Sequence, residues 1–94
     1  MNTYKPKVLI VDDEKGLRVG AQRLLSSEGY EVTTAENGTD GINFGTDSEF
    51  DLAIIDLKMP DVDGLEVLQR IKEKYPNTVC FIATAFASYE TAVE

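Results

Sequence analysis

The sequence predicts an α/β domain in which helices cover both faces of a doubly wound, parallel β-sheet. Short apolar runs rich in β-branched residues recur along the 94-residue chain, and runs of this kind bounded by turn residues are typical of buried strands. Segments with helical periodicity separate them. Strands that alternate with helices need crossover connections, and such connections produce a parallel sheet.

The strands and the first helix follow from these patterns. The predicted strands are residues 7–11, 31–35, 51–55 and 79–83. The first helix is predicted over residues 14–28, with Gly29 as its C-terminal cap. Its apolar face recurs at helical spacing and consists of Leu17, Ala21, Leu24 and Leu25.

The sequence predicts the later helices with different strength of signal. The second is predicted from Thr39 or Asp40 to about Phe44 and is weakened by two glycines, each of which costs roughly 1 kcal/mol relative to alanine. The third begins at Gly64 and ends before Pro76. A fourth begins near Ser88, and the chain ends inside it, so we interpret residues 1–94 as one domain cut within that helix.

Composition limits the functions that this domain can have. Its net charge is −8, which disfavours direct binding to nucleic acid because such binding depends on cationic side chains that neutralise phosphates. The N-terminus lacks the apolar segment of a secretory leader, and no apolar run reaches the length of a membrane span. We therefore expect a cytoplasmic protein that does not contact membranes.

Carboxylates end two of the predicted strands. The apolar run 52–55 ends in Asp56, and the run 7–11 ends in Asp12 and Asp13. If these strands are neighbours, three carboxylates converge at one edge of the sheet. Like charges that close repel one another unless a cation or a proton intervenes, so the pattern predicts a site for a divalent cation.

The loop after Asp56 contains two further aspartates, Asp61 and Asp63. We interpret both as turn residues. A calcium loop of the EF-hand type would need an acidic or asparagine residue at Met59 and a glutamate at Arg70, and the sequence has neither.

Three segments together resemble a known family. They are VLIVDDE at residues 8–14, IIDLKMPDVDGLEVL at residues 54–68 and FIATA at residues 81–85. In this order and at these spacings the sequence resembles the receiver domain of two-component response regulators. Residues 84–94 further resemble the receivers of transcriptional activators of the NtrC type, and the resemblance runs over the whole chain.

The resemblance implies a flavodoxin-like sheet of strand order 2-1-3-4-5, in which strands 1 and 3 are neighbours. The fifth strand, with its lysine, and the last helix are absent from this sequence, which leaves the order 2-1-3-4. We interpret the chain as a fragment of a longer receiver, and the alternative is a naturally short receiver. In either case the fourth strand would be an exposed edge, so we expect self-association or a swapped dimer.

The resemblance also implies roles for individual residues. Asp56 would accept a phosphoryl group from a sensor histidine kinase, Thr84 would hydrogen-bond that group, and Ala85 would leave room for it. The implied ligands of Mg²⁺ are Asp13 and Asp56 directly, the backbone carbonyl of Lys58, and Asp12 through water. The alternatives are that Asp12 and Asp13 only cap the following helix and that Thr84 is an ordinary hydroxyl before a helix.

The implied function is a phosphorylation-dependent switch that acts on an effector domain in a longer chain. Such a domain assists its own phosphorylation and is not a classical enzyme. A second hypothesis is a receiver-like interaction module that no longer switches, since the lysine is missing. A third is a Mg²⁺-dependent hydrolase, which is disfavoured because the chain has no histidine.

Overall fold

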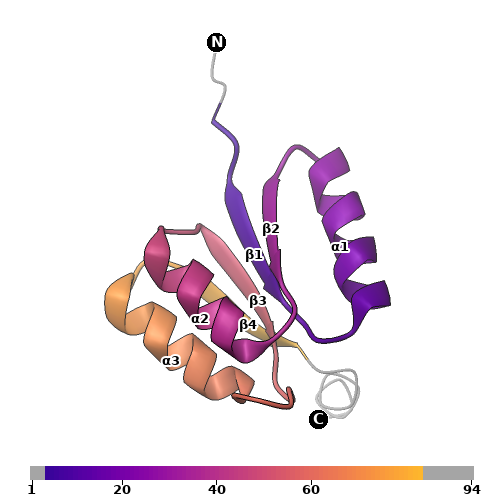
Figure 1. Cartoon of the computed structure of the whole chain (residues 1–94). Helices are drawn as coiled ribbons and strands as arrows, with labels where there is room; N and C mark the ends of the chain where they lie inside the picture. The colour runs from indigo at the N-terminus through magenta and orange to yellow at the C-terminus, as the bar shows by residue number, and fades with distance from the viewer. Residues whose placement is uncertain (1–3, 84–94) are drawn as a thin grey trace, which may run out of the picture.

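A parallel sheet of four strands lies between helices on its two faces (Figure 1). The computed structural model describes residues 4–83. The strands are β1 Lys7–Val11, β2 Glu31–Ala35, β3 Leu52–Asp56 and β4 Val79–Ala83, and the helices are α1 Lys15–Ser27, α2 Gly38–Asp47 and α3 Gly64–Lys74. The order β2-β1-β3-β4 confirms the predicted fold class. The helix expected from Ser88 lies outside the described residues.

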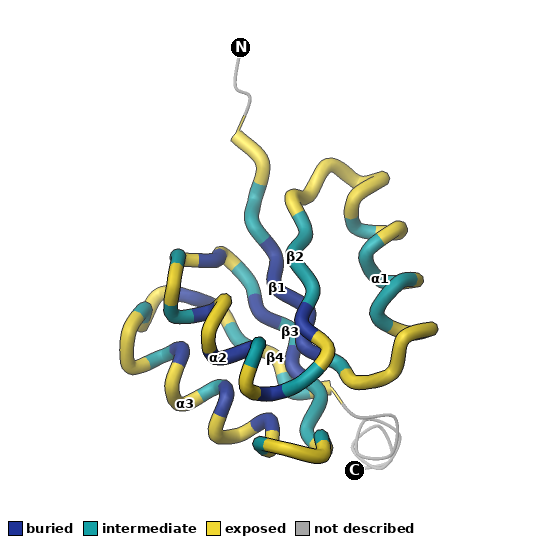
Figure 2. Tube along the Cα trace, viewed as in Figure 1, coloured by how far each residue is buried: buried dark blue, intermediate teal, exposed yellow. Residues whose placement is uncertain are grey.

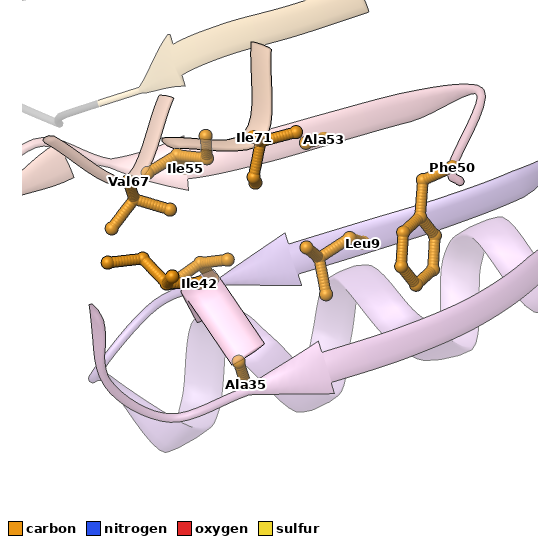
Figure 3. Packing of buried hydrophobic residues seen from close by; sticks show 9 residues of the cluster. Leu9, Ala35, Ile42, Phe50, Ala53, Ile55, Val67 and Ile71 are labelled. Carbon is orange, nitrogen blue, oxygen red and sulfur yellow. The ribbon is translucent and has the colours of Figure 1, made fainter. Parts of the chain in front are cut away.

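The order in which the chain adds strands reverses between β1 and β3, and this reversal places helices on both faces of the sheet. The β1-to-β2 and β3-to-β4 connections run in opposite directions across the sheet, so right-handed crossovers place α1 on one face and α2 and α3 on the other (Figure 1). The main core lies under α2 and α3 (Figure 3). It consists of Leu9, Val11, Ala35, Ile42, Phe50, Ala53, Ile55, Val67 and Ile71.

Helix α2 is longer than its sequence predicts, and its glycines explain the difference. A Cβ atom on Gly41 would lie 2.7 Å from Cγ1 of Val11, and one on Gly45 would lie 2.5 Å from Cδ1 of Ile71. The glycines therefore let the helix approach the sheet and α3 closely. Burial of this face stabilises a helix of low intrinsic propensity, and the side chain of Asn37 caps its start by accepting from the amide of Asp40 at 2.7 Å.

The apolar face predicted for α1 is wrong in part. Leu17 and Leu24 are 57% and 63% exposed, and the helix has no fully buried residue. The reason is its position, because α1 covers β1 and β2, and no other described helix lies on its face of the sheet (Figures 1 and 2). The predicted C-terminal cap is confirmed, since Gly29 has a φ of 97° and the amide of Tyr30 donates to the carbonyl of Leu25.

The starts of β3 and β4 are tied together by a buried side chain. Thr78 is fully buried, and its hydroxyl donates to the carbonyl of Phe50 at 2.7 Å. The amide of Val79 donates to the carbonyl of Asp51 at 3.1 Å. These bonds lie beside the register in which Leu52 pairs with Val79, and β3 both begins and ends one residue later than predicted.

Candidate metal and phosphoacceptor site

Asp12, Asp13 and Asp56 meet at the carboxyl ends of β1 and β3. Val11 pairs with Ile55 in the parallel register, so the residues that follow them are neighbours. One carboxylate oxygen from each aspartate lies within 4.8 Å of those of the other two. Asp13 is exposed, whereas Asp12 and Asp56 are partly buried. The structure thus brings together the three acidic residues on which the predicted cation site depends.

Backbone contacts hold Asp12 in place. One of its carboxylate oxygens accepts from the amide of Glu14 at 2.9 Å, and its own amide donates to the carbonyl of Ala35 at 3.1 Å. The N-cap position of α1 is Glu14, whose side chain makes no capping bond. Asp12 therefore closes the turn before the helix with one oxygen while its carboxylate remains part of the acidic cluster.

Arg18 supports this turn from α1. Its Nη1 donates to the carbonyl of Asp12 at 2.9 Å, and its Nη2 lies 3.9 Å from the carboxylate of Glu36. The side chain is largely buried, so it places a positive charge next to the backbone of the acidic turn. No sequence pattern indicates this role, because Arg18 acts on a carbonyl group and not on one of the carboxylates.

The environment of Asp56 disfavours its charged form. Burial raises the pKa of the Asp56 carboxyl, and the charge of Asp12 and then that of Asp13 raise it further. The nearby backbone N–H of Lys58 favours the charged form of the carboxyl and opposes the rise in its pKa. A divalent cation would relieve both the burial cost and the repulsion. Carboxylate oxygens are the hard ligands that Mg²⁺ prefers, so the donor set fits this ion.

The loop 57–63 connects Asp56 to α3. The amide of Gly64 donates to the carbonyl of Leu57 at 2.8 Å, which closes the loop. Lys58 is exposed, and its carbonyl stays a predicted metal ligand. Thr84 and Ala85, the predicted contacts of a phosphoryl group, lie outside the described residues.

The two loop aspartates have roles beyond those of turn residues. Asp63 caps α3 by accepting from the amide of Glu66 at 3.1 Å. Asp61 instead accepts hydrogen bonds from the start of α2, at Gly38 and Thr39. The partners of Asp61 are more than twenty residues away in the chain, so no local pattern could have indicated them.

The unfavourable environment of the ionised Asp56 carboxylate leads to a prediction about the stability of the fold. A raised pKa in the folded state means that ionised Asp56 destabilises the fold, and this cost appears as the pH rises through that pKa. Asp56→Asn should therefore raise the free energy of unfolding at pH 7 without metal, by on the order of 1 kcal/mol. Thermal unfolding in EDTA measures the change, and the gain should shrink as the pH falls toward the ordinary range of a carboxyl group.

Magnesium should make wild type the more stable of the two proteins. A cation that binds only the folded state adds about 2.7 kcal/mol to the free energy of unfolding when its concentration is one hundred times its dissociation constant. Wild type should gain more from Mg²⁺ than Asp56→Asn does. Asp63→Asn removes a charge from the same loop outside the cluster, so it should respond to Mg²⁺ as wild type does. An Asp56→Asn variant that is less stable than wild type in EDTA would contradict the expectation.

Comparisons with known proteins agree with this geometry. The family model of the response regulator receiver domain matches residues 8–94. Sporulation initiation phosphotransferase F of Bacillus subtilis is 35% identical over 88 residues, which are 94% of this chain and 71% of that protein. The transcriptional regulatory protein ZraR of Klebsiella oxytoca is 38% identical over 94 residues, the whole of this chain but 21% of that protein. The chain belongs to the family of response regulator receiver domains.

Solved structures share the fold. The response regulator TrrA of Thermotoga maritima, in complex with Mg²⁺-BeF, is 36% identical with a TM-score of 0.82, and the match covers 92% of this chain and 75% of that one. TrrA in complex with the histidine kinase ThkA also matches, with 37% identity, a TM-score of 0.78 and coverage of 86% and 70%. In residues 4–83 no helix has the length and apolar character that a membrane crossing requires.

Proposed function

We propose that this domain is a phosphorylation-dependent signalling switch in which Asp56 accepts a phosphoryl group from a sensor histidine kinase. The observation that carries the proposal is the position of Asp56, at the end of β3 and within 4.8 Å of the carboxylate oxygens of Asp12 and Asp13. In an open α/β sheet this reversal point is where ligands bind. The complex of TrrA with a histidine kinase supports a kinase as the donor.

In the proposed reaction an oxygen of Asp56 bonds to phosphorus while the bond from phosphorus to the donor nitrogen breaks. The product is an acyl phosphate, a form of covalent catalysis by a carboxylate. The nearby backbone N–H of Lys58 favours the charged form of the Asp56 carboxyl. Transfers of this kind depend mainly on positioning and on neutralised charge, so we regard the domain as a phosphoacceptor that assists its own modification and not as a classical enzyme.

The proposed cofactor is Mg²⁺, held by Asp13, Asp56 and the carbonyl of Lys58, with Asp12 acting through water. When bound, the ion would supply positive charge that offsets the charges of the carboxylates and of the incoming phosphoryl group. The acidic cluster and the TrrA complex with Mg²⁺-BeF support this assignment.

The intact mass of the chain after incubation with a small phosphodonor tests the proposal. We expect a gain of one phosphoryl group with Mg²⁺ and no gain in EDTA. A chain that binds its partner but shows no gain under any condition would instead favour a receiver-like module that does not switch.

The proposed setting is the cytoplasm, in line with the match to the response regulator receiver family. We also propose an effector domain in a longer chain. The match to ZraR supports it, because most of that regulator lies outside the matched segment. Direct binding of nucleic acid by this domain is not proposed, given its net charge of −8.

We further propose that two copies of this chain associate through β4. In the described part of the chain β4 pairs with β3 alone and so forms one edge of the sheet. Val79 and Phe81 are 52% and 57% exposed, and they pair with the partly buried Leu52 and Ile54 on the face that carries α1. An apolar edge with unpaired backbone groups is suited to a second identical edge, in a side-by-side or a swapped dimer.

Phe81→Lys should therefore shift the chain from dimer to monomer in light scattering across a range of concentrations. Leu65→Lys is the matched control, since Leu65 is 56% exposed but lies on α3, over the other face. The control should leave the mass unchanged. A wild-type chain that stays monomeric at the highest concentration would refute the association.

A further inference from the structure

Asp61 joins the loop after β3 to the start of α2. Its Oδ1 accepts from the amide of Gly38 at 3.0 Å, and its Oδ2 accepts from the amide of Thr39 at 2.9 Å and from the hydroxyl of Thr39 at 2.7 Å. These bonds hold the pKa of the Asp61 carboxyl well below its usual range. A carboxylate at a helix N-terminus is also favoured by the helix dipole.

The contact between loop and helix is close as well as polar. A Cβ atom on Gly38 would lie 2.7 Å from the carbonyl oxygen of Val62 and 3.3 Å from Oδ1 of Asp61. Glycine at this position therefore lets the loop backbone rest against the first turn of α2. Val62 and Met59 in addition contact the main core. The loop is thus held at its far side by α2 and at its base by the bond between Gly64 and Leu57.

Asp61 does more than cap α2, although it accepts from two free amides of the first turn of that helix, at Gly38 and Thr39. Helix α2 already has an N-cap, since Asn37 accepts from the amide of Asp40 at 2.7 Å. Asp61 lies 23 residues from Gly38 along the chain, so its bonds tie two separate segments. One of these segments carries Lys58, whose backbone N–H lies near the carboxylate of Asp56 and lowers its pKa.

We propose that Asp61 is a positioning residue that clamps the loop 57–63 to α2 and thereby fixes the backbone of Lys58 beside Asp56. The inference rests on the proposed Mg²⁺ site, because the Lys58 carbonyl is one of its ligands. Residues that hydrogen-bond to the ligands of a metal and orient them, without contacting the metal, typically change metal affinity by about 10- to 100-fold when they are removed. The clamp would act in this way through the backbone, without contacting the ion.

The test compares Asp61→Ala with Asn37→Ala, which removes the cap of α2 but no contact with the loop. One readout is amide hydrogen exchange in the loop 57–63 without metal, and the other is the dissociation constant for Mg²⁺ from calorimetry. Asp61→Ala should speed exchange in the loop and weaken Mg²⁺ binding by about 10-fold or more. Asn37→Ala should lower the melting temperature and leave both readouts as in wild type.

Two outcomes would overturn the clamp. One is unchanged loop exchange in Asp61→Ala, and the other is an equal change in both variants, which would mean a purely structural role. Failure of the proposed Mg²⁺ site can be told apart from failure of the clamp, because wild type itself would then show no Mg²⁺ binding. Loop exchange would still decide whether Asp61 holds the loop. Thr39→Val, which removes one of the three bonds, should give a smaller effect in the same direction.

Discussion

Asp56→Asn should abolish the Mg²⁺-dependent gain of one phosphoryl group in the intact mass of this chain. The amide keeps the size of the side chain but lacks the negative oxygen that attacks phosphorus in the proposed reaction. It also removes one of the three carboxylates of the proposed cation site. Because nucleophile and ligand are lost together, we expect labelling to fall below detection and not merely to slow.

The matched control for this variant is Asp63→Asn. Asp63 lies on the same loop and caps α3 by accepting from Glu66, and asparagine is an equally good cap. The control therefore removes one negative charge without removing a group of the site, and it should be labelled as wild type is. Labelling of Asp56→Asn at the wild-type level would place the phosphoacceptor elsewhere and refute the assignment.

Asp13→Asn separates the loss of a metal ligand from the loss of the nucleophile. Asp13 is exposed and belongs to the acidic cluster, but in the proposed reaction it forms no bond to phosphorus. The variant should still be labelled at high Mg²⁺ concentrations, with a requirement for the ion that is raised relative to wild type. A wild-type dependence on Mg²⁺ would remove Asp13 from the proposed ligands.

The strands could be predicted because their information is local. Each is a short run rich in apolar or β-branched residues that ends at a polar or charged residue, and β1, β2 and β4 have the predicted limits. The meeting of Asp12 and Asp56 also followed from the sequence, since it needs only that β1 and β3 are neighbours. The family resemblance supplied the strand order, and the order then placed the carboxylates.

The errors arose where packing overrides local preference. Gly41 and Gly45 weaken a helix in isolation, yet here they are the positions at which α2 approaches Val11 and Ile71. Leucines at helical spacing predict a buried face, but Leu17 and Leu24 are exposed because α1 covers only part of its face of the sheet. Neither fact is contained in the periodicity of the segment concerned.

Gly64→Ala should disturb the site from the opposite side of the loop. Gly64 is buried, and a Cβ atom there would lie 2.3 Å from the carbonyl oxygen of Asp56 and 2.9 Å from Cα of Leu57. These are backbone atoms, which cannot rotate away as a flexible side chain could. Either the start of α3 or the end of β3 must therefore move.

We expect the variant to lose about 1–3 kcal/mol of stability, the usual cost of overpacking, and to be labelled much more slowly than wild type. Urea unfolding measures the first effect, and the rate of mass gain measures the second. The rates are compared at a temperature where each variant is fully folded, so that a slow rate reflects a displaced Asp56 and not a smaller folded population.

Two other glycines give the matched controls. A Cβ atom on Gly20 meets nothing within 4 Å, so Gly20→Ala should stabilise α1 by up to about 1 kcal/mol and leave labelling unchanged. Gly45→Ala forces a Cβ atom against the side chain of Ile71 in the core, away from the site, and should destabilise the fold without slowing labelling of the folded chain. If Gly45→Ala slows labelling as much as Gly64→Ala, the effect is one of general stability, and close packing of Gly64 against Asp56 is not what holds the proposed phosphoacceptor in place.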